Sequence, residues 1–540
     1  MNAAELLIRC LENEGVELVF GVPGEENLHI LDALADSAIR FIPVRHEQGA
    51  AFMADVYGRL TGKAGVCLST LGPGATNLLT GVADANMDRA PLVALTGQAN
   101  LDRMHKESHQ CVDIVRIFRP VTKWNAGISR SSVIPEAVRK AFKVAQTEKP
   151  GATHLDIPED IVAETFAESS RPEPLLVQAP FRPEPLARQI ERAQKVLAQA
   201  RRPVFLAGHG AIRNQAADAV RACAQRLNIP VLHTFMAKGL MPDHHPLSLY
   251  TLGLKASDHA NQTIGEADLV ITVGYDFVEF APCLWNPDRD KHIVHLDLSP
   301  AEVDAHYLVD VGVLGDLRLS LEQIAEGLDP WDSGWATHVR NRVESMFQRL
   351  REAPRTWPMR PQHIIEDLRA ELREDALVIT DVGFHKLWMA RLFSCYQPNT
   401  CILSNGYAAM GLSLPGAVAA KLLYPDRPVV AVVGDGGFLM NAHELETAVR
   451  HQLALVVLVW RDNGYGVIRW KQSLQFHRTF GVDFTNPDMV RFAESFGAVG
   501  YRVSAPDELR PLLRKALDAQ APVVIDCPVD YSDGLGLVPA

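Results

Sequence analysis

The sequence predicts an α/β fold made of several domains, each built on a parallel sheet. Two apolar runs of strand length, 429–433 and 453–460, enclose a glycine-rich turn and a helix-like segment over 441–451, which is the order of a parallel βαβ unit. The segment 64–96 has the same order of strand, glycine turn, helix and strand, so we expect two divergent copies of one unit. A chain of 540 residues is too long for one hydrophobic core and suggests three or four domains.

The overall composition argues against several kinds of partner and location. Hydrophobic residues make up 47% and charged residues 22%, as in ordinary soluble proteins, and the net charge of −12 gives no support to nucleic-acid binding. The first residues suit an amphipathic helix rather than an export signal, and no apolar run approaches the roughly 18 residues of a membrane span. The eight cysteines include no CxxC pair, so we expect a reducing cytoplasm.

Apolar periodicity places the remaining elements in chain order. The first third is expected to hold strands over 18–21, 39–44, 64–69 and 91–96, with helices over 28–34 and 49–60 and from the turn 71–77 to about 88. Later strands are expected over 203–208, 268–273, 292–296, 377–381 and 402–404. The segments 169–185 and 353–361 are rich in proline, and we predict that they link domains.

Two polar turns are expected at one edge of a sheet. The turn Gly434–Gly437, which contains Asp435, follows the strand 429–433, and Asp462 follows the strand 453–460. Because parallel strands end at a shared carboxyl edge, the two aspartates are predicted to share a site. Carboxylate oxygens suit Mg²⁺ and backbone N–H groups at a helix start suit phosphate, so these residues fit a metal-bridged diphosphate. On composition alone, a pair of solvated turn aspartates is an open alternative.

Two other features are open to more than one interpretation on composition alone. Glu47 lies just inside the start of a predicted helix, where a carboxylate often only complements the helix dipole. Gly208-His209-Gly210 is similar to a dinucleotide-binding turn, but the third glycine and the acidic ribose partner are missing, so this signal is weak. The predicted strands around it indicate a Rossmann-like central domain.

Several motifs closely resemble those of thiamine-diphosphate-dependent enzymes, and the resemblance covers essentially the whole chain. Gly-Asp-Gly at 434–436 is followed by WRDNGY, and the interval from Asp435 to Asp462 is that of the family, 462 − 435 = 27. The segments RHEQGAAFMADVYGRLTGKAGV and LGPGATN resemble the pyrimidine-binding domain. The nearest resemblance is to acetolactate synthases of the catabolic, FAD-free type. It implies pyrimidine-binding, central and diphosphate-binding domains, all Rossmann-like with parallel sheets, over 1–168, 186–335 and 360–532.

The resemblance implies a metal site and a set of cofactor contacts. Mg²⁺ is expected to take the side chains of Asp435 and Asp462 and the carbonyl of Gly464, and Asp462 stands where most members have Asn. The expected cofactor-binding residues are Pro23, Glu47, Gly72, Asn77, Gly383, His385, Met410, Gly434, Gly436, Gly437 and Tyr465.

The resemblance also implies three catalytic residues. Glu47 is expected to pass a proton to a ring nitrogen of the aminopyrimidine, and Gln110 is expected to face the cofactor. Met410 is expected to wedge the cofactor into a bent form, although without the matching segment around it this side chain would be assigned to core filling.

The implied function is decarboxylation of a 2-oxo acid, with pyruvate the first candidate, and carboligation to a second 2-oxo acid. Thiamine diphosphate and Mg²⁺ are the implied cofactors. No FAD is expected, because the segment 274–280, GYDFVEF, with Trp285 after it, resembles the flavin-free enzymes. Sites of this family lie between subunits, which implies a homodimer or homotetramer without nucleic-acid or membrane partners.

Three departures from acetolactate synthases keep other functions open. Ala408 and Ala409 stand where Gln-Thr is usual, Glu26 stands where Lys is frequent, and Lys471 lies near a usual Gln. A non-ligating 2-oxo acid decarboxylase and a carboligase with a different acceptor are therefore alternatives. A non-catalytic structural or regulatory subunit is a third alternative, against which the complete set of expected metal and catalytic residues argues.

Overall fold

The computed structural model describes residues 1–253 and 259–532. Contacts between Cα atoms divide it into two compact units. The first unit contains Met1–Pro180, Gly406–Pro425 and Leu439–Leu453. The second contains Phe181–Asn405, Asp426–Phe438 and the chain from Ala454 onward.

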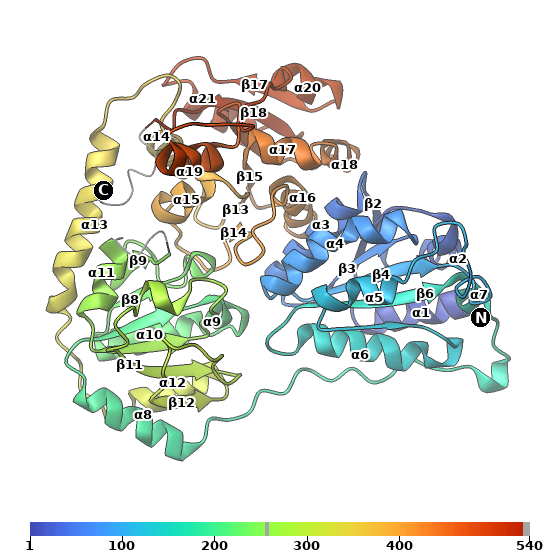
Figure 1. The fold of residues 1–540 in the computed structure, drawn as a ribbon, viewed down its shortest axis with the longest axis horizontal. Coiled ribbons are helices and arrows are strands. Elements are labelled where there is room, and N and C mark those ends of the chain that lie inside the picture. Colours follow the sequence, from blue (N-terminus) through green and yellow to red (C-terminus); the bar gives the residue numbers. More distant parts are fainter. Residues whose placement is uncertain (254–258, 533–540) are drawn as a thin grey trace. The chain divides into compact units, whose positions relative to one another are not determined.

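The first unit is built on a six-stranded parallel sheet with the order β2-β1-β3-β4-β6-β5 (Figure 1). Its strands are β1 (Leu18–Gly21), β2 (Arg40–Pro43), β3 (Gly65–Ser69), β4 (Leu92–Gln98), β5 (Trp124–Gly127) and β6 (Ala152–Pro158). Its helices are α1 (Ala3–Asn13), α2 (Leu28–Ala35), α3 (Glu47–Thr61), α4 (Pro73–Met87), α5 (Ile114–Phe118), α6 (Ile134–Gln146), α7 (Glu159–Ala163), α16 (Ser413–Leu423) and α18 (Glu444–Arg450).

Local sequence explains how these helices begin, end and pack. A capping box starts α1, in which the Asn2 side chain accepts from the Glu5 N–H at 2.8 Å and Glu5 Oε2 accepts from the Asn2 N–H at 2.9 Å. Gly62 ends α3 with a left-handed φ of 71°. A Cβ at Gly81 of α4 would lie 2.5 Å from the Cβ of Ala51, so glycine lets α3 and α4 pack closely.

The second unit contains a sheet with the order β12-β11-β10-β7-β8-β9. This is the doubly wound order of a Rossmann fold, and the predicted central domain has it. Its strands are β7 (Pro203–Ala207), β8 (Val231–His233), β9 (Ser248–Thr251), β10 (Leu269–Val273), β11 (His292–Asp297) and β12 (Val311–Leu314). Its helices are α8 (Ala187–Gln199), α9 (His209–Arg213), α10 (Ala217–Leu227), α11 (His259–Glu266), α12 (Leu317–Ala325) and α13 (Gly334–Glu352).

The third sheet has the order β14-β13-β15-β16-β18-β17. Counted from its own first strand, this is the order of the first sheet, which supports the predicted internal duplication. Its strands are β13 (Leu377–Thr380), β14 (Cys401–Leu403), β15 (Val429–Gly434), β16 (Val456–Arg461), β17 (Val499–Arg502) and β18 (Val523–Pro528). The helices of this part in the second unit are α14 (Pro361–Glu371), α15 (Phe384–Leu392), α19 (Gly466–Phe476), α20 (Met489–Ser495) and α21 (Leu509–Leu517), and α17 (Asp435–Asn441) begins in the second unit and ends in the first.

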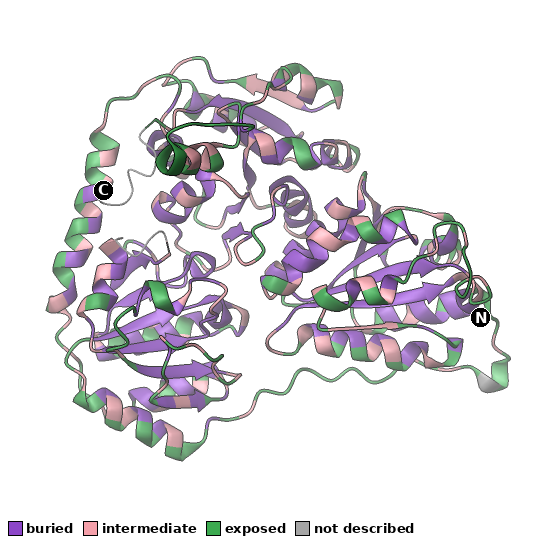
Figure 2. Ribbon diagram, viewed as in Figure 1, coloured by how far each residue is buried: buried purple, intermediate pink, exposed green. Residues whose placement is uncertain are grey.

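The predicted α/β class with parallel sheets is therefore confirmed. Figure 2 shows the strands of each sheet mostly buried, with exposed residues on the outer faces of the helices. The predicted linker 169–185 has no regular element after the 3₁₀ turn that ends at Ser170, and its Phe181 is 87% exposed. Within the described residues, no helix has the length and apolar character needed to cross a membrane.

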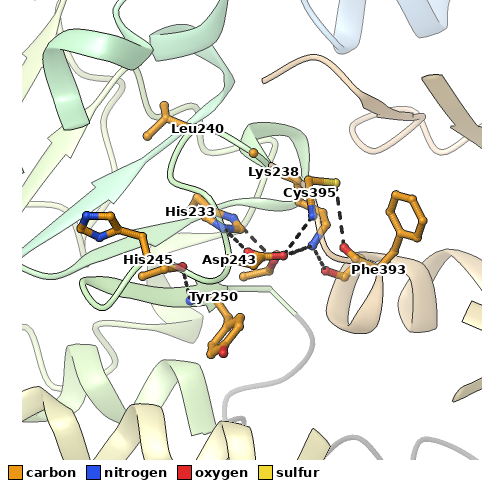
Figure 3. Close-up of polar contacts among 12 residues, drawn as sticks. His233, Lys238, Leu240, Asp243, His245, Tyr250, Phe393 and Cys395 are labelled. Atoms are coloured by element: carbon orange, nitrogen blue, oxygen red, sulfur yellow. Dashed lines mark hydrogen bonds and ion pairs between the residues drawn. The ribbon is translucent and has the colours of Figure 1, made fainter. Parts of the chain in front are cut away.

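A buried polar cluster joins the central sheet to the segment after α15 within the second unit (Figure 3). Asp243 Oδ2 accepts from the Cys395 N–H at 3.2 Å and lies 3.8 Å from Lys238 Nζ. Lys238 Nζ also donates to the Ala390 carbonyl at 3.0 Å. Burial alone would raise the pKa of Asp243, but Lys238 and His233 bring it below its usual value. Two hydrogen bonds made by this charged pair thus join these two parts of the unit.

Two predicted boundaries were wrong. The helix expected over 441–451 is two helices, and the first of them, α17, already begins on the glycine-rich turn. The strand expected from Leu453 begins at Val456. Glycine has low helix propensity, which is why the turn was expected to be irregular, but neither Gly436 nor Gly437 has a positive φ. Close contacts select glycine at these positions instead.

Candidate active site

The turn after β15 is closely packed at the carboxyl edge of the third sheet. A Cβ at Gly437 would overlap the carboxylate of Asp381, and a Cβ at Gly436 would lie 3.0 Å from the ring of Tyr465. The Tyr465 ring is held edge-on by Phe484, with 5.1 Å between the ring centroids. Glycine at these two positions therefore lets the side chains of Asp381 and Tyr465 pack directly against the backbone of the turn.

His385 of α15 lies beside this turn. Its Cε1 would be 3.3 Å from a Cβ at Gly434 and 2.7 Å from a Cβ at Gly383. Burial lowers the pKa of His385 to about 3, and its Nε2 has no hydrogen-bond partner among the described residues. A nearby diphosphate would favour the protonated ring, which donates from both nitrogens, so this unsatisfied imidazole fits a diphosphate group.

Asp435 is a buried carboxylate of this site, with 1% exposure. Its Oδ2 accepts from the Asn463 N–H at 2.7 Å and from Asn486 Nδ2 at 2.7 Å, and its Oδ1 accepts from the Gly436 N–H at 3.0 Å. Burial raises the pKa of Asp435, and these three donors oppose that effect. The side chain is thus held in one orientation at the start of α17.

Asp462 follows β16 and lies close to Asp435, as predicted. Burial and the charge of Asp435 raise the pKa of Asp462 to about 7. Arg469 Nη1 lies 3.3 Å from Asp462 Oδ2 and offsets part of this repulsion. Gly464 is buried two residues further along the chain.

This donor set fits a hard divalent cation. Among residues 1–253 and 259–532 no three His, Cys, Asp or Glu side chains form a group that could hold a metal ion. Two carboxylates and a backbone carbonyl are all oxygen donors, and Mg²⁺ usually completes its octahedron with water and phosphate oxygens. A cation between Asp435 and Asp462 would also remove the repulsion that raises the pKa of Asp462.

In the first unit, Glu47 is the first residue of α3 and is 9% exposed. The ring of His46 caps the helix by accepting from the Gln48 N–H at 3.1 Å. Asn77 Nδ2 donates to Glu47 Oε2 at 3.0 Å, and Gly74 leaves room beside Oε1, where a Cβ would lie at 3.3 Å. Asn77, predicted as a cofactor contact, therefore orients the carboxyl group of Glu47.

The structure brings a second pair of predicted residues together. Gly72 precedes α4 with a φ of 53°, and a Cβ at this position would lie 2.7 Å from the carbonyl oxygen of Gln110. Gln110 is exposed, with a left-handed φ of 57°. Pro23 is exposed in the loop between β1 and α2. No hydrogen bond links Pro23 to the other predicted residues in the described part of the chain.

Met410 is half-buried in the segment between β14 and α16. Ala408 has a left-handed φ of 56°. Gly411 follows Met410, and its carbonyl accepts from Asn441 Nδ2 at 2.9 Å. A Cβ at Gly411 would lie 2.5 Å from that nitrogen, so the amide of Asn441 fits against a glycine.

Sequence reasoning missed two polar residues that support the site. Asn486 bonds Asp435 from a loop far along the chain, and no local motif marks it. Glu444 of α18 accepts from the N–H groups of Arg45 and His46 at 3.1 and 3.2 Å, just before α3. Burial raises the pKa of Glu444 to about 7. Its place three residues after Asn441, at a helix start, was the only signal in the sequence.

Comparisons with known proteins agree with this geometry. The family described as "Thiamine pyrophosphate enzyme" matches with its N-terminal TPP binding domain over residues 1–117, its central domain over 190–324 and its C-terminal TPP binding domain over 381–527. An acetolactate synthase of Bacillus subtilis is 39% identical, and the match covers 99% of this chain and 94% of that protein. A catabolic acetolactate synthase of Raoultella terrigena is 35% identical over 98% of this chain and 96% of its own length.

The chain belongs to the thiamine pyrophosphate enzyme family. This relationship covers all three sheets, because the matched segments together include strands of each.

At the carboxyl edge of the central sheet of this thiamine pyrophosphate enzyme, side chains of the chain itself bond the start of α9. Glu279 accepts from the His209 N–H with both carboxylate oxygens, at 3.0 and 3.1 Å, and also accepts from the hydroxyl of Thr234. Burial raises the pKa of Glu279 to about 7. Beside it, Trp285 Nε1 donates to the hydroxyl of Tyr275 at 3.0 Å. A carboxylate of the chain thus occupies the helix start where doubly wound folds bind a dinucleotide phosphate.

Gly437→Ala tests whether the close packing of the turn matters. We expect a lower melting temperature, with overpacking costing about 1–3 kcal/mol, and weaker Mg²⁺-dependent binding of thiamine diphosphate in calorimetry. Gly265→Ala is the matched control, because Gly265 is also helical but a Cβ there meets nothing within 4 Å. Equal affinity for thiamine diphosphate in Gly437→Ala and Gly265→Ala would contradict the expected contact of Gly437 with the cofactor.

Glu279→Gln tests the buried carboxyl group of the central sheet. The folded pKa of about 7 lies above the ordinary 4.5, so the native state keeps a proton that the unfolded state loses between these values. Glu279 therefore stabilises the fold at low pH, and this contribution, at most about 3 kcal/mol, is lost as pH rises to 7. We expect the melting temperature of the wild type, measured relative to Glu279→Gln, to fall from about pH 5 to pH 8. Parallel curves of melting temperature against pH for the two proteins would contradict the raised pKa of Glu279.

Proposed function

We propose that this enzyme uses thiamine diphosphate and Mg²⁺ to decarboxylate a 2-oxo acid, namely pyruvate, and joins the two-carbon unit to a second 2-oxo acid. The observation that carries the proposal is the close pair of Asp435, which is buried, and Asp462, which is half-buried, beside the glycine turn and His385. The choice of reaction is supported by relatives named acetolactate synthases, which match almost the whole length of this chain.

Each group of residues has a distinct part in this proposal. When bound, thiamine diphosphate supplies a nucleophilic carbon and an electron sink for decarboxylation. His385 and the glycine turn bind the diphosphate, and Asp435, Asp462 and the Gly464 carbonyl hold the metal. Asn77 orients Glu47 through the bond at 3.0 Å, and Glu47 moves a proton to and from a ring nitrogen of the cofactor.

We further propose that the enzyme is a cytoplasmic homodimer or homotetramer. The proposal follows the resemblance to thiamine-diphosphate-dependent enzymes, whose sites lie between subunits. A monomer that binds thiamine diphosphate as tightly as the oligomer would contradict this arrangement.

Analysis of the products formed from pyruvate tests the proposed reaction. We expect acetolactate, and its formation should require added Mg²⁺ and thiamine diphosphate. Acetaldehyde without a ligation product would instead support the non-ligating decarboxylase. That outcome is an alternative because Ala408 and Ala409 replace the usual Gln-Thr beside Met410.

Glu47→Gln separates cofactor binding from chemistry. The variant keeps the shape of the side chain and an acceptor for Asn77 but cannot exchange a proton, so we expect turnover to fall by at least about 100-fold. The affinity for thiamine diphosphate should change far less, because the diphosphate and metal contacts are elsewhere. Exchange of the thiazolium C2 proton, followed by quenched NMR, should slow with turnover. Unchanged C2 exchange would mean that Glu47 only complements the helix dipole.

The purified enzyme should be colourless, without a flavin absorption spectrum near 450 nm. The physical reason is that Glu279 already takes the His209 N–H at the start of α9, and a second anion there would repel its carboxylate. Added FAD should give no shift in melting temperature. A yellow preparation that releases FAD on denaturation would overturn the flavin-free proposal.

A further inference from the structure

Four charged side chains form a buried cluster between α3 and α4. Arg59 contacts Asp55 at 2.6 Å, Asp84 at 3.2 Å and Asp88 at 2.9 Å. All four side chains are at most 1% exposed. Asp55 and Arg59 are one turn apart on α3, and Asp84 and Asp88 are one turn apart at the end of α4.

The cluster contains more carboxylates than are needed to pair with its one arginine. One guanidinium faces three carboxylates, and a bidentate pairing with Asp55 alone would satisfy much of it. Burial, and for Asp84 also the charges of Asp88 and Asp55, raise the pKa of Asp55 and of Asp84. Burying extra carboxylates is costly, so their presence calls for a further role.

The extra carboxylate oxygens bind a separate segment of the chain. The Gly406 N–H donates to Asp88 Oδ1, and the Ala409 N–H donates to Asp84 Oδ1 at 3.4 Å. Between these bonds Tyr407 and Ala408 are exposed, and Ala408 has the left-handed φ of 56°. The next residue after Ala409 is Met410. The segment 406–409 is thus fixed at both ends by acids whose second oxygen is held by Arg59.

We propose that Asp84, Asp88 and Arg59 are positioning residues that fix the segment 406–409 and thereby the placement of Met410 toward the cofactor. This inference rests on the proposed function and on the expected contact between Met410 and the cofactor. Each acid contributes one oxygen to Arg59 and one to a backbone N–H, so the guanidinium sets the direction of both carboxylates. The Gly411–Asn441 bond holds the far side of Met410. Without the two acids, the segment before Met410 would lose both of these bonds.

The test uses Asp84→Asn and Asp88→Asn. Asparagine has the shape of aspartate but one side-chain oxygen, so it cannot accept from both Arg59 and the segment. Asp156→Asn is the matched control, because Asp156 is 1% exposed and also divides its two oxygens, between Thr96 at 2.7 Å and Gln98 at 3.0 Å. Both of these partners lie outside the segment 406–409, so Asp156→Asn measures the general cost of replacing a buried aspartate by asparagine.

The first measurement is amide hydrogen exchange in the cofactor-free protein. In the wild type we expect the Gly406 and Ala409 amides to exchange more slowly than those of Tyr407 and Ala408. We expect Asp88→Asn to speed exchange at Gly406, and Asp84→Asn at Ala409, by roughly 10-fold, with no change in Asp156→Asn. Unprotected wild-type amides would overturn the proposal even if neither variant folded.

The second measurement compares turnover with cofactor binding. We expect kcat and the rate of thiazolium C2 exchange to fall roughly 10-fold in both cluster variants, while the Kd for thiamine diphosphate stays within about 3-fold. Equal losses in kcat and in cofactor affinity, or losses no larger than in Asp156→Asn, would overturn the positioning role. Exchange of the C2 proton needs no substrate. It therefore tests the positioning role of Asp84 and Asp88 even if the wild type makes no acetolactate and the proposed reaction fails.

Discussion

The proximity of Asp435 and Asp462 is the constraint around which the third sheet is arranged. Two carboxylates at one sheet edge repel each other, and partial burial strengthens the repulsion, as the raised pKa of Asp462 shows. Asp435 accepts hydrogen bonds from two backbone N–H groups and one side-chain amide, and Asp462 forms an ion pair with Arg469. These groups lower the cost of keeping both acids in place, and a divalent cation would remove the rest of it.

The first and third sheets share a strand order but use their carboxyl edges differently. In the third sheet the strand end, glycine turn and helix start hold oxygen donors and a histidine that suit a metal and a diphosphate. In the first sheet the strand that corresponds to β15 is β3, and the helix start after it is that of α4. Glu47 follows β2 instead, and it accepts from Asn77 of α4. The same supersecondary unit thus carries two close carboxylates in the third sheet and, in the first, an amide that orients the single carboxyl group of Glu47.

The sequence predicted most of the fold because buried parallel strands are continuous apolar runs and their turns carry glycine. It predicted the residues that lie next to those turns, such as Asp435 and Asp462, for the same reason. It could not predict Asn486 or Glu444, since each reaches its partner from a distant segment and no periodicity records the contact. It could not predict the helical turn at Gly436 because glycine disfavours helix, and the close approach of Tyr465 explains why glycine stands there.

The central sheet shows why strand order alone does not determine a ligand. Its doubly wound order and the Gly208-His209-Gly210 turn provide the helix start that binds phosphate in dinucleotide-binding folds. Glu279 satisfies that helix start from within the chain, and Thr234 holds the carboxylate in place. A ligand anion would have to displace a carboxylate that is already desolvated and bonded. Function thus follows from which side chain reaches the crevice, while the fold only provides the crevice.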